Sequence, residues 1–151
     1  MCDISVGVQR HLNFFTQRQL HLLARARTWF VDGTFYVVRS PFIQLWSIHA
    51  FVRIDESMKQ LPLAFGLMSS RRSKDYGAVI NVLLGKIREA RLNLSVESVV
   101  SDFEAALWND VRRVLPQVDM RGCVFHWGQA VWRMVQDLSQ SAKVPLIIDH
   151  M

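Results

Sequence analysis

The sequence predicts an α/β domain in which helices cover a mixed β-sheet. Half of its 151 residues are hydrophobic and 21% are charged, a composition that favours a folded core over disorder. In the first half, runs of β-branched and aromatic residues are separated by short polar turns, as in antiparallel strands. In the second half, helical spacing of apolar residues alternates with short apolar runs, which predicts helices that cross between strands.

Residues 1–27 precede the clear pattern and are ambiguous. Thr16 is a suitable N-cap for a short helix with Leu20, Leu23 and Ala24 on one face. We therefore expect this segment to be an N-terminal helical extension.

Three strands are predicted next, over residues 29–38, 42–52 and 61–68. Because the turns between them are short, we expect an antiparallel meander. Pro62 and Gly66 fall on one face of the third strand, which indicates a strand at the edge of the sheet.

Helices and strands then alternate. Ser73 is a suitable N-cap for a helix with Tyr76 and Ile87 on its apolar face, and Phe103 begins the inward face of a second helix that Pro116 ends. The later elements are expected at residues 96–101 (strand), 103–115 (helix), 120–125 (strand) and 127–138 (helix). The result is a five-stranded mixed sheet with flanking helices, a meander followed by two parallel strands, which is the element order of the RNase H-like fold.

Two aspartates occur in apolar stretches at or near strand ends. Asp32 lies in the first strand of the meander, where the adjacent Gly33 leaves room for a ligand or another chain, and Asp102 follows the fourth strand. Taken singly, Asp32 is explained by a turn and Asp102 by a helix N-cap. In the inferred topology, however, the first and fourth strands are neighbours, so the two carboxylates would face each other. Such a pair suits Mg²⁺ or Mn²⁺, ions that support phosphodiester transfer.

Cys123 and His126 have the CxxH spacing of half a zinc site. The other half is missing, because the only other cysteine is the distant Cys2 and no second CxxC or HxxxH occurs. We therefore expect a packed or hydrogen-bonded pair in a protein from a reducing compartment.

A basic excess favours a polyanionic partner, since the formal net charge is +5. Arg71, Arg72 and Lys74 cluster after the third strand and can contact phosphates, although each alone is also explained by a solvated charged face. No apolar run reaches the roughly 18 residues of a membrane span, so we expect no membrane partner.

Four segments in order resemble the MULE (Mutator-like element) transposase domain. They are WFVDGTF at residues 29–35, LPLAFGLM at 61–68, SDFEAA at 101–106 and GCVFHWGQA at 122–130. The resemblance extends over roughly residues 28–138.

The resemblance implies an RNase H-like core, residues 28–140, in which three acids (DDE) hold Mg²⁺ or Mn²⁺ for DNA strand cleavage and transfer. Asp32 and Asp102 match the first two acids, and Cys123 and His126 match a motif thought to organise the core. The third acid is a Glu that follows a long helical insertion, and no residue here matches it. We therefore expect a C-terminally truncated fragment with a tail at 141–151 and weak or no activity alone. Transposon-end and target DNA are the implied partners, the nucleus is the implied location, and homo-oligomers remain open.

Two alternatives remain. The chain can be a domesticated, non-catalytic DNA-binding or protein-interaction domain that keeps the fold. An unrelated host nuclease with this fold would need a third and usually a fourth acid near the pair, and none can be assigned.

Overall fold

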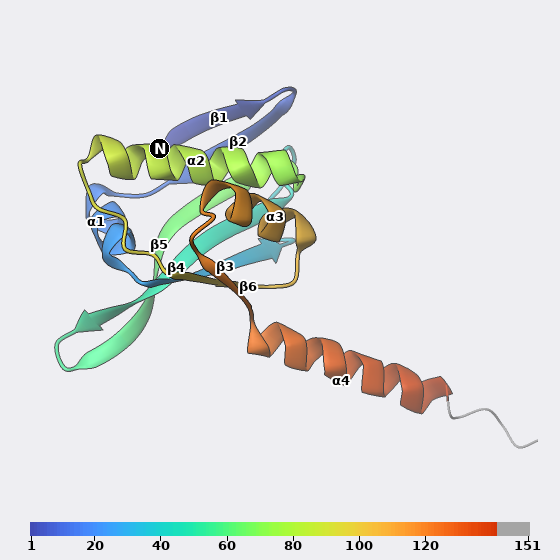
Figure 1. The fold of residues 1–151 in the computed structure, drawn as a ribbon. Helices are drawn as coiled ribbons and strands as arrows, with labels where there is room; N and C mark the ends of the chain where they lie inside the picture. Colours follow the sequence, from blue (N-terminus) through green and yellow to red (C-terminus); the bar gives the residue numbers. More distant parts are fainter. Residues whose placement is uncertain (142–151) are drawn as a thin grey trace, which may run out of the picture.

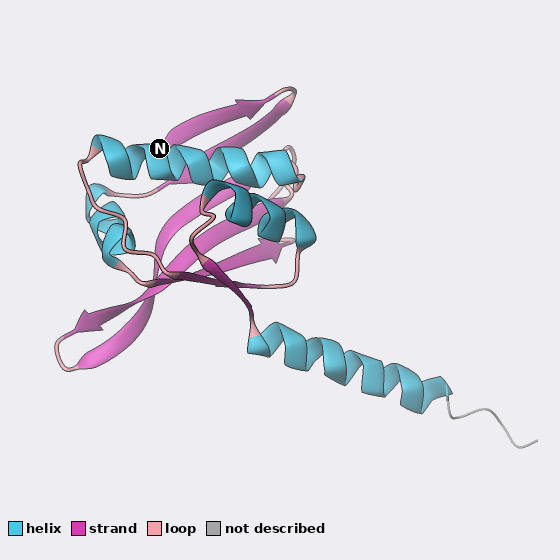
Figure 2. Ribbon diagram, in the orientation of Figure 1, coloured by secondary structure: helices cyan, strands magenta, loops and turns pink. Residues whose placement is uncertain are grey.

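Seven strands form one mixed sheet in the computed structural model, which describes residues 1–141 (Figures 1 and 2). Their order across the sheet is β1-β2-β5-β4-β3-β6-β7. The strands span Cys2–Val6 (β1), Gln9–Phe14 (β2), Thr28–Phe35 (β3), Gln44–Ile54 (β4), Ser57–Met68 (β5), Ser98–Ser101 (β6) and Asp119–Gly122 (β7). The helices span Gln17–Arg25 (α1), Ser73–Glu89 (α2), Ala105–Val114 (α3) and Val124–Ser141 (α4). The predicted α/β class is confirmed, but the prediction of five strands is wrong.

The two additional strands form a hairpin in the segment that was expected to be only helical. Gly7 adopts a φ of 64°, which an L-residue rarely tolerates, and it turns the chain between Val6 and Gln9. Strand β2 then pairs antiparallel with the last four residues of β5. This strand lacks the usual alternation of apolar residues, because its inward side chains include the polar residues His11 and Asn13. Both side chains are nevertheless fully buried.

The N-terminal helix itself is as predicted. Thr16 caps α1 in a capping box: its hydroxyl accepts from the Gln19 amide at 3.2 Å, and the Gln19 side chain accepts from the Thr16 amide at 2.7 Å. Leu20, Leu23 and Ala24 are buried, as their spacing indicated.

Strands β3, β4 and β5 form the predicted antiparallel meander. The edge position predicted for the third strand is correct for only half of it. Strand β2 covers Phe65–Met68, whereas Pro62 pairs only with β4, next to a register shift at Ile48/His49. A proline is tolerated there because the edge opposite β4 requires no N–H donor at that position.

The crossover half contains β6 and β7, both parallel to β3 as predicted. Its helix starts differ from the predictions. Arg72, not Ser73, is the N-cap of α2, and Glu104, not Asp102, is the N-cap of α3. Phe103 precedes α3 and is 56% exposed, so the prediction that it faces the core is wrong.

One face of the sheet is packed against α1, α2 and α3 (Figure 1). Alternate residues of β3 and β4, among them Trp29, Val31, Trp46 and Ile48, form a single buried cluster with apolar side chains of the three helices. The opposite face of β3 and β4 carries Phe30, Asp32 and Phe51 and is only partly covered. Helix α4 extends away from the sheet (Figure 1). None of the helices that the structure describes is long and apolar enough to cross a membrane.

Candidate active site

Asp32 projects from the face of β3 that the helices do not cover. Its neighbour Val31 is 5% exposed in the core, and because side chains alternate along a strand, Asp32 points to the opposite side. Its side chain is 49% exposed. Across the antiparallel pair it lies opposite Ser47 of β4. The carboxylate is therefore accessible to a ligand from solvent.

Asp102 lies at the same end of the neighbouring strand. Strands β3 and β6 are parallel, and their last paired residues are Val31 and Ser101. Asp32 and Asp102 each follow these last paired residues by one position, where the pairing of β3 with β6 ends. The neighbouring positions of the first and fourth predicted strands are thereby confirmed.

The backbone at Asp102 is held by hydrogen bonds. Its carbonyl accepts from the Trp108 indole N–H at 2.6 Å and from the Ser101 hydroxyl at 2.9 Å. Its carboxylate oxygen Oδ1 lies 3.3 Å from the Glu104 amide nitrogen, which donates to it. These contacts fix the turn from β6 into α3 and leave acceptor capacity on the carboxylate.

A hollow of about 280 Å³ adjoins Asp32. Two imidazoles line it, one from His49 on β4 and one from His126 on α4. The His126 Nε2 atom lies 3.9 Å from Asp32 Oδ1, and the His49 Nε2 atom lies 2.9 Å from the Ser47 hydroxyl oxygen. Asp32 therefore lies beside a hollow that imidazoles from two different elements line.

Burial lowers the pKa of His49, and the negative charge of Asp32 partly opposes this effect. Burial disfavours the charged imidazolium, whereas a nearby carboxylate favours it. The pKa of His49 is therefore a probe of the charge at Asp32.

Gly33 is explained by an internal contact, not by room for a ligand. A Cβ atom at this position would collide with the Gln44 side chain, which is buried. The Tyr76 hydroxyl donates to the Glu104 carboxylate at 2.8 Å, and the amide oxygen Oε1 of Gln44 lies 3.0 Å from the same hydroxyl oxygen. Burial raises the pKa of Tyr76, and Glu104 raises it further. These contacts connect Gly33, next to Asp32, with Glu104, two residues after Asp102. The Glu104 carboxylate accepts the Tyr76 hydrogen bond in this arrangement.

The CxxH residues lie beside this site. Cys123 and His126 both line the hollow next to Asp32, and the Cys123 amide donates to the Ser101 carbonyl at 2.7 Å. Within residues 1–141, no group of three or more His, Cys, Asp and Glu side chains could hold a metal ion. The proximity of His126 to Asp32 was not predicted from the sequence. The predicted strand order could have indicated it, because the CxxH segment follows β7 and β7 lies next to β6 and near β3.

The three predicted basic residues differ in their contacts. Arg72 makes two hydrogen bonds, of 2.8 and 3.0 Å, to the buried carboxylate of Asp75. The Arg71 guanidinium lies 4.7 Å from the ring centre of Phe35, the last residue of β3. Lys74 is exposed on the first turn of α2.

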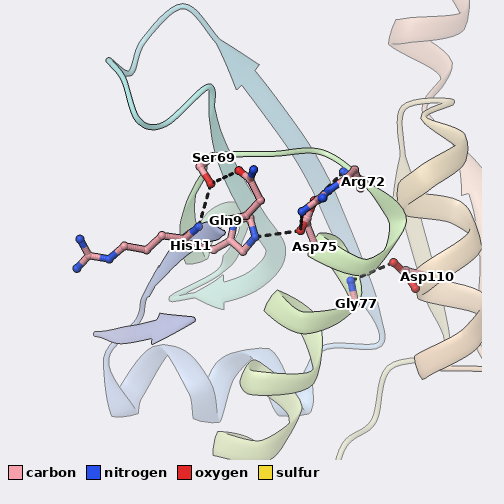
Figure 3. A network of polar contacts seen from close by, with 8 residues as sticks. Gln9, His11, Ser69, Arg72, Asp75, Gly77 and Asp110 are labelled. Atoms are coloured by element: carbon pink, nitrogen blue, oxygen red, sulfur yellow. Dashed lines mark hydrogen bonds and ion pairs between the residues drawn. The ribbon is translucent and has the colours of Figure 1, made fainter. Parts of the chain in front are cut away.

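A second polar cluster joins β2 to the start of α2 and supports the fold (Figure 3). The fully buried Asp75 carboxylate is 3.3 Å from the His11 Nε2 atom, besides its contacts to Arg72. Burial raises the pKa of Asp75, but hydrogen bonds from Arg72, Ser70 and the Arg72 backbone together hold it well below its usual range. This cluster could not be predicted from the sequence, because its residues come from separate elements.

The architecture and the site define an α/β domain with two carboxylates at the point where the pairing of two parallel strands ends. The MULE transposase domain family matches residues 28–130, about two thirds of the sequence, and the chain belongs to this family. The match covers β3 with Asp32, the turn after β6 with Asp102, and the start of α4. A search of curated proteins finds no match.

Proposed function

We propose that this domain takes part in DNA transposition through metal-dependent cleavage and transfer of DNA strands, with Asp32 and Asp102 as catalytic metal ligands. The proposal follows from family membership together with the register of β3 and β6, which brings the two aspartates to one end of the sheet. It includes an RNase H-like arrangement for strands β5-β4-β3-β6-β7, to which β1 and β2 add an N-terminal hairpin.

The donor set suits a hard divalent cation. Carboxylate oxygens are the ligands that Mg²⁺ and Mn²⁺ prefer, and two carboxylates brought close together repel each other unless a cation or a proton lies between them. When bound, the metal would activate the attacking oxygen and stabilise the leaving oxygen. Asp32 and Asp102 would orient it, and the bonded carbonyl of Asp102 would keep its side chain in place.

The substrate backbone would be held by cations near the same end of β3. Arg71 and Lys74 are exposed there and can neutralise phosphates. Arg72 is already bound to Asp75, so its contribution to DNA binding would be smaller. With DNA as its partner, the protein would act in the nucleus, as the family resemblance implies.

Nicking of supercoiled DNA in Mn²⁺ tests the proposal. The purified chain should nick the DNA slowly, and Asp32→Asn and Asp102→Asn should each remove this activity, whereas Asp119→Asn should not. Asp119 is a matched control because it is an exposed carboxylate on β7 whose ion-pair partner is Arg121.

Equal nicking by the Asp32→Asn variant would identify a contaminating nuclease and contradict the proposal. An inactive chain that still binds DNA would favour the non-catalytic binding domain instead. Loss of binding in Arg71→Ala, with binding retained in Arg72→Ala, would support the assignment of the phosphate contacts.

A further inference from the structure

Helix α4 carries an apolar surface that the rest of the described chain does not cover. Large side chains are exposed along its length, with Trp127 at 59%, Trp132 at 63% and Leu138 at 64%. In a folded domain such side chains are normally buried, and a contiguous apolar patch usually marks an interaction site.

Most of the exposed apolar side chains form a continuous stripe, and Phe125 and Trp132 flank it on one side. With about 100° between successive residues, seven positions fall within an arc of about 120° centred on Val131. All seven are non-polar: Val124, Trp127, Gly128, Val131, Met134, Val135 and Leu138. The opposite side carries the polar residues His126, Gln129, Arg133 and Gln136. The helix is therefore amphipathic even though its apolar side has no partner within the described chain.

The stripe is complementary to itself. Positions 124 and 138, 127 and 135, and 128 and 134 are related by inversion of the chain direction about residue 131. In an antiparallel pair of α4 helices, Trp127 would lie level with Val135 of the second copy, and Gly128 level with Met134. At these two levels a large side chain lies beside a smaller one, which suits close helix packing.

We infer that two copies of this chain pair through α4, antiparallel and with Val131 on the two-fold axis. The same patch serves both copies, as a symmetric dimer requires. The inference concerns assembly and does not depend on the proposed DNA chemistry.

The available area is sufficient for this purpose. From the exposed fractions, the stripe exposes on the order of 600 Å² per copy, so its complete burial in both copies would reach the lower end of the range of about 1,200–2,000 Å² for specific interfaces. In the antiparallel pair the two sheets would lie at opposite ends, because each sheet is attached to the N-terminal end of its own α4. The described helix is about 27 Å long, which separates the two sheets. The first turn of α4 also lines the hollow beside Asp32, so pairing would hold His126 and Phe125 in place.

Sedimentation analysis or light scattering of the whole chain at micromolar concentration tests the inference. We expect a dimer for the wild type and for Gln129→Glu, which adds one charge on the opposite side of the helix. Val131→Glu adds the same charge on the axis, where two carboxylates would meet, and should weaken the dimer by at least about tenfold. Glutamate favours the helix more than valine does, so the helix itself should persist.

Cysteine cross-linking is a second test of the same contact, and it can be used if Val131→Glu is poorly soluble. Val131→Cys should form a disulfide-linked dimer under mild oxidation beyond the background from Cys2 and Cys123, and Gln129→Cys should not. A monomeric wild type, equal dimerisation of the two glutamate variants, or equal cross-linking at both positions would overturn the inference. If the wild type were monomeric, the apolar stripe of α4 would have to bind a partner other than a second copy.

Discussion

The two faces of the central sheet differ in what they contribute. The face under α1, α2 and α3 is closed: Trp29, Val31 and Ile48 are buried with helix side chains, and the polar groups of Asp75 and His11 lie within contact of each other. The other face is open at its centre and presents Asp32, His49 and His126 around a hollow.

Residues of the same strands therefore contribute either to stability or to ligand binding, according to the face they occupy. Alternation places Val31 in the core and Asp32 outside it, one residue apart. Substitutions on the closed face should therefore change the free energy of unfolding, and substitutions on the open face should change metal or DNA binding with little effect on stability.

The largest expected contrast is between two aspartates. Asp75→Ala should lower the free energy of unfolding by about 3–5 kcal/mol, because it removes one partner of a buried charged cluster and leaves His11 and Arg72 without their acceptor. Asp32→Ala should change it by less than about 0.5 kcal/mol, since Asp32 is half exposed. Urea unfolding followed by circular dichroism measures both, and equal losses would contradict the division between the faces.

The same cluster predicts acid sensitivity. The pKa of Asp75 is lowered in the folded state, so its contribution to stability is present above the unfolded pKa, about 3.9, and is lost as the pH falls towards the folded value. The wild type should lose stability below about pH 4 more steeply than Asp75→Asn, which cannot ionise at this position. Parallel pH profiles for the two proteins would show that Asp75 does not provide the sensitivity.

A smaller effect is expected at two glycines. Gly33→Ala should cost about 1–3 kcal/mol, because its Cβ would collide with the buried Gln44 side chain. Gly85→Ala in α2 meets no atom within 4 Å and should stabilise the protein by about 0.5–1 kcal/mol through helix propensity. Thermal unfolding of both variants distinguishes a packing requirement from a general effect of adding a methyl group.

The smallest predicted change is a shift in the pKa of one histidine. Asp32→Asn removes the charge that opposes the burial effect on His49, so the pKa of His49 should fall further below 6.5. NMR titration of the His49 ring measures this shift, with Asp119→Asn as the control. An unchanged or raised pKa would show that the two side chains do not interact.

Much of the fold was predictable because it follows local chemistry. Thr16 and Gln19 form a capping box, and the β-branched and aromatic runs around Trp29 and Trp46 became paired strands. The β2 strand was not predictable from hydrophobic alternation, because His11 and Asn13 occupy buried positions that are normally apolar and are compensated only by distant groups such as the Val79 carbonyl.

The site was predictable in part. The two aspartates were found because carboxylates in apolar stretches are costly without compensation, and the strand order then made them neighbours. The proximity of His49 and His126 to Asp32 depends on tertiary packing, and so does the use of Gly33 as space for Gln44. The exposure of the apolar side of α4 could not be foreseen either, since its spacing is that of any packed helix.

Paramagnetic broadening by Mn²⁺ is the most direct test that Asp32 and Asp102 form one metal site. Substoichiometric Mn²⁺ should broaden the backbone amide signals around both residues together, with a single apparent dissociation constant, and Asp32→Asn or Asp102→Asn should each abolish both effects. Broadening around only one of the two residues, or broadening that persists in either variant, would contradict a shared site.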